Sequence, residues 1–95
     1  MNSRSKGKAG ELELAHVLQE YGFEARRGHY PEPDVLGIPG VHIECKRREQ
    51  LRILEWMEQS KKDAAPGEIP VVMHRVNRGE WLVTMRLADW MVMRG

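Results

Sequence analysis

Residues 41–46 read Val-His-Ile-Glu-Cys-Lys, and their strict alternation of apolar and polar side chains constrains the fold more than any other feature. Successive side chains of a β-strand point to opposite faces of a sheet, so Val, Ile and Cys share one face while His, Glu and Lys share the other. A second strand candidate spans 34–38, and Pro39-Gly40 lies between the two segments. This order predicts an antiparallel hairpin.

Helical spacing of apolar residues occurs on both sides of the hairpin. Leu14, Leu18 and Tyr21 recur at this spacing within 8–21 and predict a helix that ends at Gly22. A second helix is expected over 49–65, before Pro66-Gly67. Further patterns predict strands at 23–26, 69–73 and 80–85, a loop at 28–33 and a closing helix at 87–93. The order α-β-β-β-α-β-β-α predicts an α/β (α+β) fold, a mixed sheet flanked by helices.

The chain has 95 residues, which is enough for one domain over 1–95 with a thin core. Its one cysteine, Cys45, excludes an internal disulfide framework and a cysteine-rich zinc site. No apolar run is long enough to span a membrane, and the first residues lack the apolar stretch of a signal peptide. We therefore expect no membrane partner and a cytoplasmic location, in a bacterium or a phage-infected host cell.

The net charge of +1 conceals a segregation of the basic residues. Residues 1–10 contain Arg4, Lys6 and Lys8 but no acidic residue, so 1–7 is expected to be a basic N-terminal arm. A second basic cluster spans 46–52, and arginine, which suits phosphate groups, outnumbers lysine ten to five. Composition alone does not distinguish a nucleic-acid partner from a solvated surface of mixed charge.

Three charged residues of the hairpin, Asp34, Glu44 and Lys46, can carry chemistry. Glu44 and Lys46 project from one face of a strand, and Asp34 begins the neighbouring strand. Two carboxylates suit a hard divalent cation that activates water, and the lysine ammonium can stabilise charge on a phosphate. The alternative is an exposed strand face with a cross-strand ion pair. The proline before Asp34 and the basic run after Lys46 favour phosphodiester hydrolysis.

The segment Pro33-Asp34…Glu44-Cys45-Lys46 resembles the PD-(D/E)XK signature of the restriction-endonuclease-like superfamily. Within that superfamily the chain is similar to small Holliday junction resolvases of archaeal and phage type. Those proteins begin with a basic segment and a helix bearing a glutamate four residues after a glycine, followed by a Gly-Phe-x-Ala-x-Arg-like strand. Residues 6–11 (Lys-Gly-Lys-Ala-Gly-Glu) and 22–26 (Gly-Phe-Glu-Ala-Arg) match these features in order. The resemblance covers 6–65 and the last two strands in outline, and the VRR-NUC branch shares the pattern.

The resemblance implies a restriction-endonuclease-like core and a metal site. Asp34 and Glu44 would bind Mg²⁺, for which Mn²⁺ can substitute, and the backbone carbonyl of Cys45 would complete the coordination. Lys46 would be the catalytic lysine. The Cys45 thiol is expected to be a small buried hydrophobic group.

Two further residues receive roles from the resemblance. Glu11, on the first helix, would reach the metal directly or through water. Glu13 is a nearby rival, and the spacing from the glycine favours Glu11. Gln59 resembles a glutamine that several branches place near the lysine, where it can hold the attacking water or a phosphate; the alternative is a solvated helical glutamine.

The function that the resemblance implies is a metal-dependent, structure-selective DNA endonuclease, a Holliday junction resolvase serving DNA recombination and repair. A four-way junction has two-fold symmetry, so symmetric cleavage calls for a homodimer, with Trp90, Met91 and Met93 or the second helix as the expected interface. Two alternatives stay open: a nuclease of the same fold acting on nicked, flapped or foreign DNA, and a non-catalytic nucleic-acid-binding module. The residues expected to contact DNA are Arg4, Lys6, Lys8, Arg26, Arg27, His29, Arg47, Arg48 and Arg52.

Overall fold

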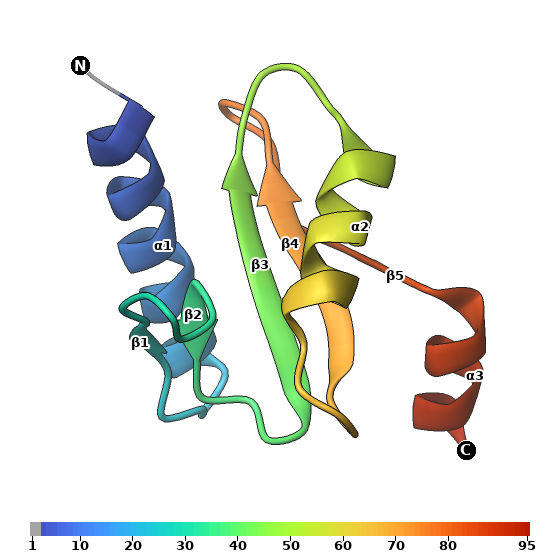
Figure 1. Cartoon of the computed structure of the whole chain (residues 1–95). Coiled ribbons are helices and arrows are strands. Elements are labelled where there is room, and N and C mark those ends of the chain that lie inside the picture. Colours follow the sequence, from blue (N-terminus) through green and yellow to red (C-terminus); the bar gives the residue numbers. More distant parts are fainter. Residues whose placement is uncertain (1–2) are drawn as a thin grey trace.

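The structure, a computed structural model, describes the backbone of residues 3–95 and the side chains from residue 7 onward. Over these residues the elements follow in the order α-β-β-β-α-β-β-α, as predicted (Figure 1). The helices are α1 (Ser3–Glu20), α2 (Ile53–Asp63) and α3 (Leu87–Arg94). The strands are β1 (Arg26–Arg27), β2 (Val35–Leu36), β3 (Val41–Arg47), β4 (Ile69–Arg75) and β5 (Leu82–Met85).

The strands form one mixed sheet in the order β1-β2-β3-β4-β5. β2 runs antiparallel to β3, with Val35 opposite Ile43, so the predicted hairpin across Pro39-Gly40 is confirmed. β3 and β4 are parallel, and α2 makes the crossover between them. The pairs β1–β2 and β4–β5 are antiparallel. The predicted fold class, a mixed sheet flanked by helices, is therefore correct.

α1 packs on the face of the sheet that carries the apolar residues of β3. Leu14, Ala15 and Leu18 of the helix are buried in one core cluster with Ile43 and Cys45. The Cys45 side chain thus lies among apolar neighbours, as expected for a small hydrophobic group.

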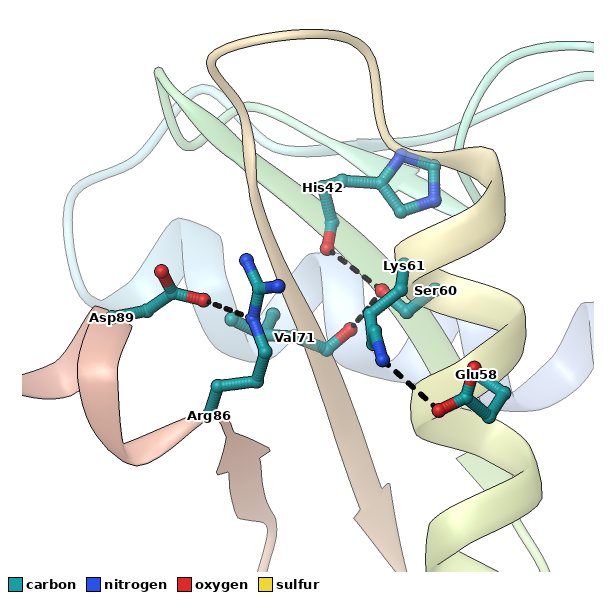
Figure 2. A network of polar contacts seen from close by, with 7 residues as sticks. All are labelled: His42, Glu58, Ser60, Lys61, Val71, Arg86 and Asp89. Carbon is teal, nitrogen blue, oxygen red and sulfur yellow. Dashed lines mark hydrogen bonds and ion pairs between the residues drawn. The ribbon is translucent and has the colours of Figure 1, made fainter.

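α2 covers the opposite face, which carries the polar residues of β3. Trp56 of the helix packs with Val72 of β4 in a second core cluster. The hydroxyl of Ser60, which is fully buried, lies 2.9 Å from the backbone carbonyl oxygen of Val71 and 3.5 Å from that of His42 (Figure 2). These contacts hold α2 directly against β3 and β4, so the helix covers the polar face of the predicted site.

The bounds of several elements differ from the predicted ones. α1 begins at Ser3 instead of residue 8, because no proline interrupts the preceding residues and each added residue contributes another helical hydrogen bond. The segment expected to be a basic arm is thus helical from Ser3, and the side chains of Arg4 and Lys6 lie outside the described residues. β4 continues to Arg75, because β3 also continues and offers it a partner at every position.

α3 stands apart from the two packed layers, at the end of β5 (Figure 1). No residue of this helix is buried. Its exposed apolar residues are Leu87, Trp90, Met91, Val92 and Met93. In the described part of the chain, no helix combines the length and apolar character needed to cross a membrane.

Candidate active site

Asp34 lies directly before β2, and its carboxylate is fixed against β3. The backbone N–H of Cys45 donates a hydrogen bond of 2.9 Å to Asp34 Oδ2. The antiparallel register that pairs Val35 with Ile43 also brings Asp34 level with Glu44. The hairpin predicted from the sequence therefore places the two carboxylates of the PD-(D/E)XK pattern side by side.

Glu44 lies in the middle of β3, beneath α2, and only 4 % of the residue is exposed. Lys46, on the same face, places its Nζ atom 3.4 Å from Glu44 Oε2. Burial, followed by the negative charge of Asp34, raises the pKa of Glu44 to about 8, although Lys46 acts in the opposite direction. The carboxylates thus repel each other, and one lysine does not balance them. Such a pair favours a bound cation.

Glu11 reaches this site from α1. Its Oε1 atom accepts a hydrogen bond of 2.8 Å from Arg27 Nε, and its side chain is largely buried. Burial and the charge of Asp34 raise the pKa of Glu11, while Arg27 and Lys46 lower it. Glu13 instead pairs with arginines of β3 and β4. Of the two candidate glutamates, the structure therefore places Glu11 within electrostatic reach of the other site residues.

A pocket of about 280 Å³ opens beside Asp34 and Glu44. Gln59 of α2 lines it, so the structure brings this predicted residue to the same hollow as the two carboxylates. The other lining residues are Tyr30, Pro31, Glu32, Pro33, His42 and Asp63.

His42 is a pocket residue that the predicted site set does not include. It is only 4 % exposed, and its Nδ1 atom lies 3.8 Å from Glu68 Oε1. Figure 2 shows its ring beside the end of α2. The sequence contains one signal for its position: His42 precedes Glu44 by two residues in a strand and so shares its face.

The donor set fits a hard divalent cation. The carboxylates of Asp34 and Glu44 and the backbone carbonyl of Cys45 are oxygen ligands of the kind that Mg²⁺ prefers. The Cys45 side chain lies in the apolar core cluster with residues of α1, where burial raises the pKa of its thiol, so the sulfur is not one of the expected ligands. Among the described side chains, no three His, Cys, Asp or Glu converge into a metal cluster. A cation here would therefore depend on the two carboxylates, the carbonyl and water.

Several basic residues lie at one end of the molecule. Figure 1 shows the N-terminal end of α1, the C-terminal end of β3 and the start of α2 at the same end. Lys8, Arg47, Arg48 and Arg52 lie on or directly beside these segments. Arg47 Nη1 lies 3.7 Å from a Glu13 carboxylate oxygen, so its charge is partly balanced.

The basic residues of β1 are engaged by acidic partners. Arg26 makes a two-pronged contact with Glu32, at 2.8 and 3.3 Å, and remains more than half exposed. Arg27 is directed at Glu11 and is mostly buried. His29 lies exposed in the loop before the site. Of these three, Arg27 therefore belongs to the interior of the candidate site.

One comparison with known proteins agrees with the observed fold. No family model and no curated protein matches the sequence. Among solved structures, the chain is similar to Hjc, a Holliday junction resolvase from the archaeal hyperthermophile Archaeoglobus fulgidus. The two are 26 % identical with a TM-score of 0.60, over 84 % of this chain and 72 % of that one. The chain therefore has the restriction-endonuclease-like fold of this archaeal resolvase, and the similarity supports a resolvase-like nuclease.

Proposed function

We propose that this chain is a metal-dependent, structure-selective DNA endonuclease that cleaves four-way junctions. The observation that carries the proposal is the convergence of Asp34, Glu44 and Lys46. The Asp34 carboxylate is fixed by the backbone N–H of Cys45, and Glu44 is buried. The ammonium group of Lys46 lies 3.4 Å from Glu44. Buried groups with strongly shifted pKa values in a pocket are typical of catalytic sites. The similarity to a Holliday junction resolvase supports junction DNA as the substrate.

Asp34, Glu44 and the carbonyl of Cys45 are the groups that would hold Mg²⁺, or Mn²⁺ in its place. Such an ion, when bound, polarises a phosphoryl oxygen and lowers the pKa of a bound water. Lys46 stabilises the negative charge that develops on the phosphate as the water oxygen attacks phosphorus. Its contact with Glu44 holds the ammonium group in place before the substrate arrives.

Gln59 and Glu11 are the remaining residues of the proposed catalytic site. The amide of Gln59 lines the pocket, where it can donate to a phosphate oxygen and accept a hydrogen bond from the attacking water. Glu11, held by Arg27, can orient a water molecule from the α1 side. In-line displacement then forms the bond from the water oxygen to phosphorus, with the water proton released to solvent, and breaks the bond from phosphorus to the 3′ oxygen, which takes a proton from solvent. The products have 5′-phosphate and 3′-hydroxyl ends.

The proposal includes a homodimer, because a four-way junction has two-fold symmetry and paired cuts need two identical sites. The exposed apolar residues Trp90, Met91 and Met93 of α3 support this part of the proposal. Apolar groups gathered on an otherwise unpacked helix are typical of a subunit interface. A second copy of the chain would bury them.

The test is cleavage of a labelled four-way junction against linear, nicked and flapped DNA, with Mg²⁺ and with chelator. We expect metal-dependent cleavage of the junction and a loss of at least about 100-fold in Asp34→Ala, Glu44→Ala and Lys46→Ala. DNA binding and melting temperature are expected to be retained. Glu20→Ala, an exposed change on α1, is the matched control.

Each of the other possible outcomes would change a different part of the proposal. Preferential cutting of nicked or flapped DNA would change the substrate and keep the chemistry. DNA binding without cleavage in any metal would indicate a non-catalytic binding module. Normal cleavage by the three variants would overturn the assignment of the site.

A further inference from the structure

Tyr30 borders the catalytic pocket, yet it is 98 % exposed, more than any other large apolar side chain described. An aromatic ring gains stability when it is buried, and this ring belongs to neither core cluster. The proposed hydrolysis gives it no role. Its place at the rim of the pocket therefore calls for a different explanation.

The loop that carries Tyr30 is held by hydrogen bonds on both sides of the residue. The backbone N–H of Glu32 donates to the carbonyl oxygen of His29 at 2.8 Å, and the N–H of His29 donates to Glu32 Oε1 at 3.0 Å. Arg26 binds both carboxylate oxygens of Glu32, and these bonds lower the pKa of Glu32 to about 2. The carboxylate stays charged at neutral pH, so the loop presents the aromatic ring in a defined place.

The rim of the pocket beside Tyr30 suits a nucleobase. The pocket's volume of about 280 Å³ is close to the lower end, ~300 Å³, of small-molecule sites, so a duplex cannot enter it. Among the residues that line it there is no lysine and no arginine. Pro31 and Pro33, on either side of Glu32 and close to Tyr30 in the loop, offer apolar surface against which a base can lie.

We propose that Tyr30 stacks on an unstacked base beside the scissile phosphate, at the rim of the pocket. This inference rests on the proposed nuclease function and extends it to substrate selection. Taking a base out of a regular duplex costs a few kcal/mol, and the cost is least where the base is already unpaired or poorly stacked. The base pairs that flank an opened branch point lose stacking on one side, whereas those inside a linear duplex are stacked on both sides. Tyr30 thereby favours branched DNA.

The experiment is a cycle that combines changes in the protein with changes in the DNA. Junctions carrying a single abasic site at each nucleotide around the branch point are bound to wild type, Tyr30→Ala and Tyr30→Phe, with fluorescence anisotropy in Ca²⁺ as the readout. Tyr21→Ala is the matched control, because Tyr21 is also largely exposed but lies at the far end of α1. Melting temperatures check that each variant folds.

We expect Tyr30→Ala to weaken junction binding about 5- to 150-fold, the range set by base–aromatic stacking of ~1–3 kcal/mol. Tyr30→Phe and Tyr21→Ala retain affinity. An abasic site at one position weakens wild type by a similar factor and has little effect on Tyr30→Ala. The preference for junction over linear duplex falls in Tyr30→Ala alone.

Two results would overturn the stacking role: unchanged affinity of Tyr30→Ala, or equal abasic penalties in wild type and Tyr30→Ala at every position. Both are binding measurements and do not depend on cleavage. Failure of the wild type to cleave any DNA would overturn the proposed function, and the binding cycle would still decide the role of Tyr30.

Discussion

At Glu44, the stability of the fold and the proposed chemistry of the site make opposite demands on one carboxyl group. Burial and the neighbouring Asp34 raise the pKa of its carboxyl to about 8 in the folded chain, from an ordinary value of 4.5. Between these values the folded state binds more protons than the unfolded state, so the free energy of unfolding falls as pH rises. We expect the melting temperature in chelator to fall between about pH 5 and pH 8, and the fall to be much smaller in Glu44→Gln.

Added divalent cation is expected to restore the melting temperature at pH 8 in wild type, because a ligand that binds only the folded state stabilises it. Glu44→Gln should gain less from the cation. Identical pH profiles for the two proteins in chelator would contradict the raised pKa.

Lys46 is the residue whose removal should separate catalysis from binding. We expect Lys46→Gln to lower the single-turnover cleavage rate about 100- to 1000-fold, because a positioned donor to the developing charge is lost. Junction affinity should change little, since the other basic residues remain. Lys61→Gln on α2, where the lysine pairs with Glu58 at 3.0 Å, is the control. A loss of affinity with an unchanged rate would instead make Lys46 a phosphate-binding residue.

At the scale of elements, the connection between β2 and β3 depends on two glycines for different reasons. Gly37 has a φ of +128°, and a Cβ there would lie 2.5 Å from the Cα of Ala25. Gly40 has a φ of +77°, with open space around the same position. We expect Gly37→Ala to cost more than about 3 kcal/mol in urea unfolding, and Gly40→Ala about 1–2 kcal/mol.

The same two glycine variants test whether the hairpin positions the candidate active site. Because Asp34 is positioned by β2, Gly37→Ala should also lower cleavage, while Gly40→Ala should leave it nearly unchanged. Equal losses of stability in the two variants would show that the close approach to Ala25 is not what requires Gly37.

At the scale of the whole molecule, α3 is the part that the single chain leaves unpacked. Trp90 is 48 % exposed on a helix that buries no residue. If two copies pack through this helix, Trp90→Asp places a charge in an apolar interface and should shift the protein toward monomer at micromolar concentration in sedimentation. Tyr21→Asp, directly after α1 and outside α3, should not. A wild type that sediments as a monomer would contradict the dimer.

Local periodicity was sufficient for the order of the elements and for the faces of β3. A strand has a repeat of two residues, so Glu44 and Lys46 share a face wherever that strand lies. The turn at Pro39-Gly40 placed Asp34 on the strand next to Glu44, but the register that brings the two carboxylates level, with Val35 opposite Ile43, was decided by the tertiary structure. The resemblance to the PD-(D/E)XK pattern then assigned chemistry to these positions, and the similarity to a solved resolvase supports the fold that the resemblance implies.

Contacts between distant segments needed the three-dimensional arrangement. Arg26 and Arg27 are adjacent in sequence, yet one pairs with Glu32 at the surface and the other with Glu11 in the interior. The burial of Glu44 depends on α2 crossing over β3, and the exposure of Tyr30 beside the pocket depends on how its loop meets α2. Such relations are set by sheet register and helix packing, which join residues far apart in the chain and leave no periodic pattern in the sequence.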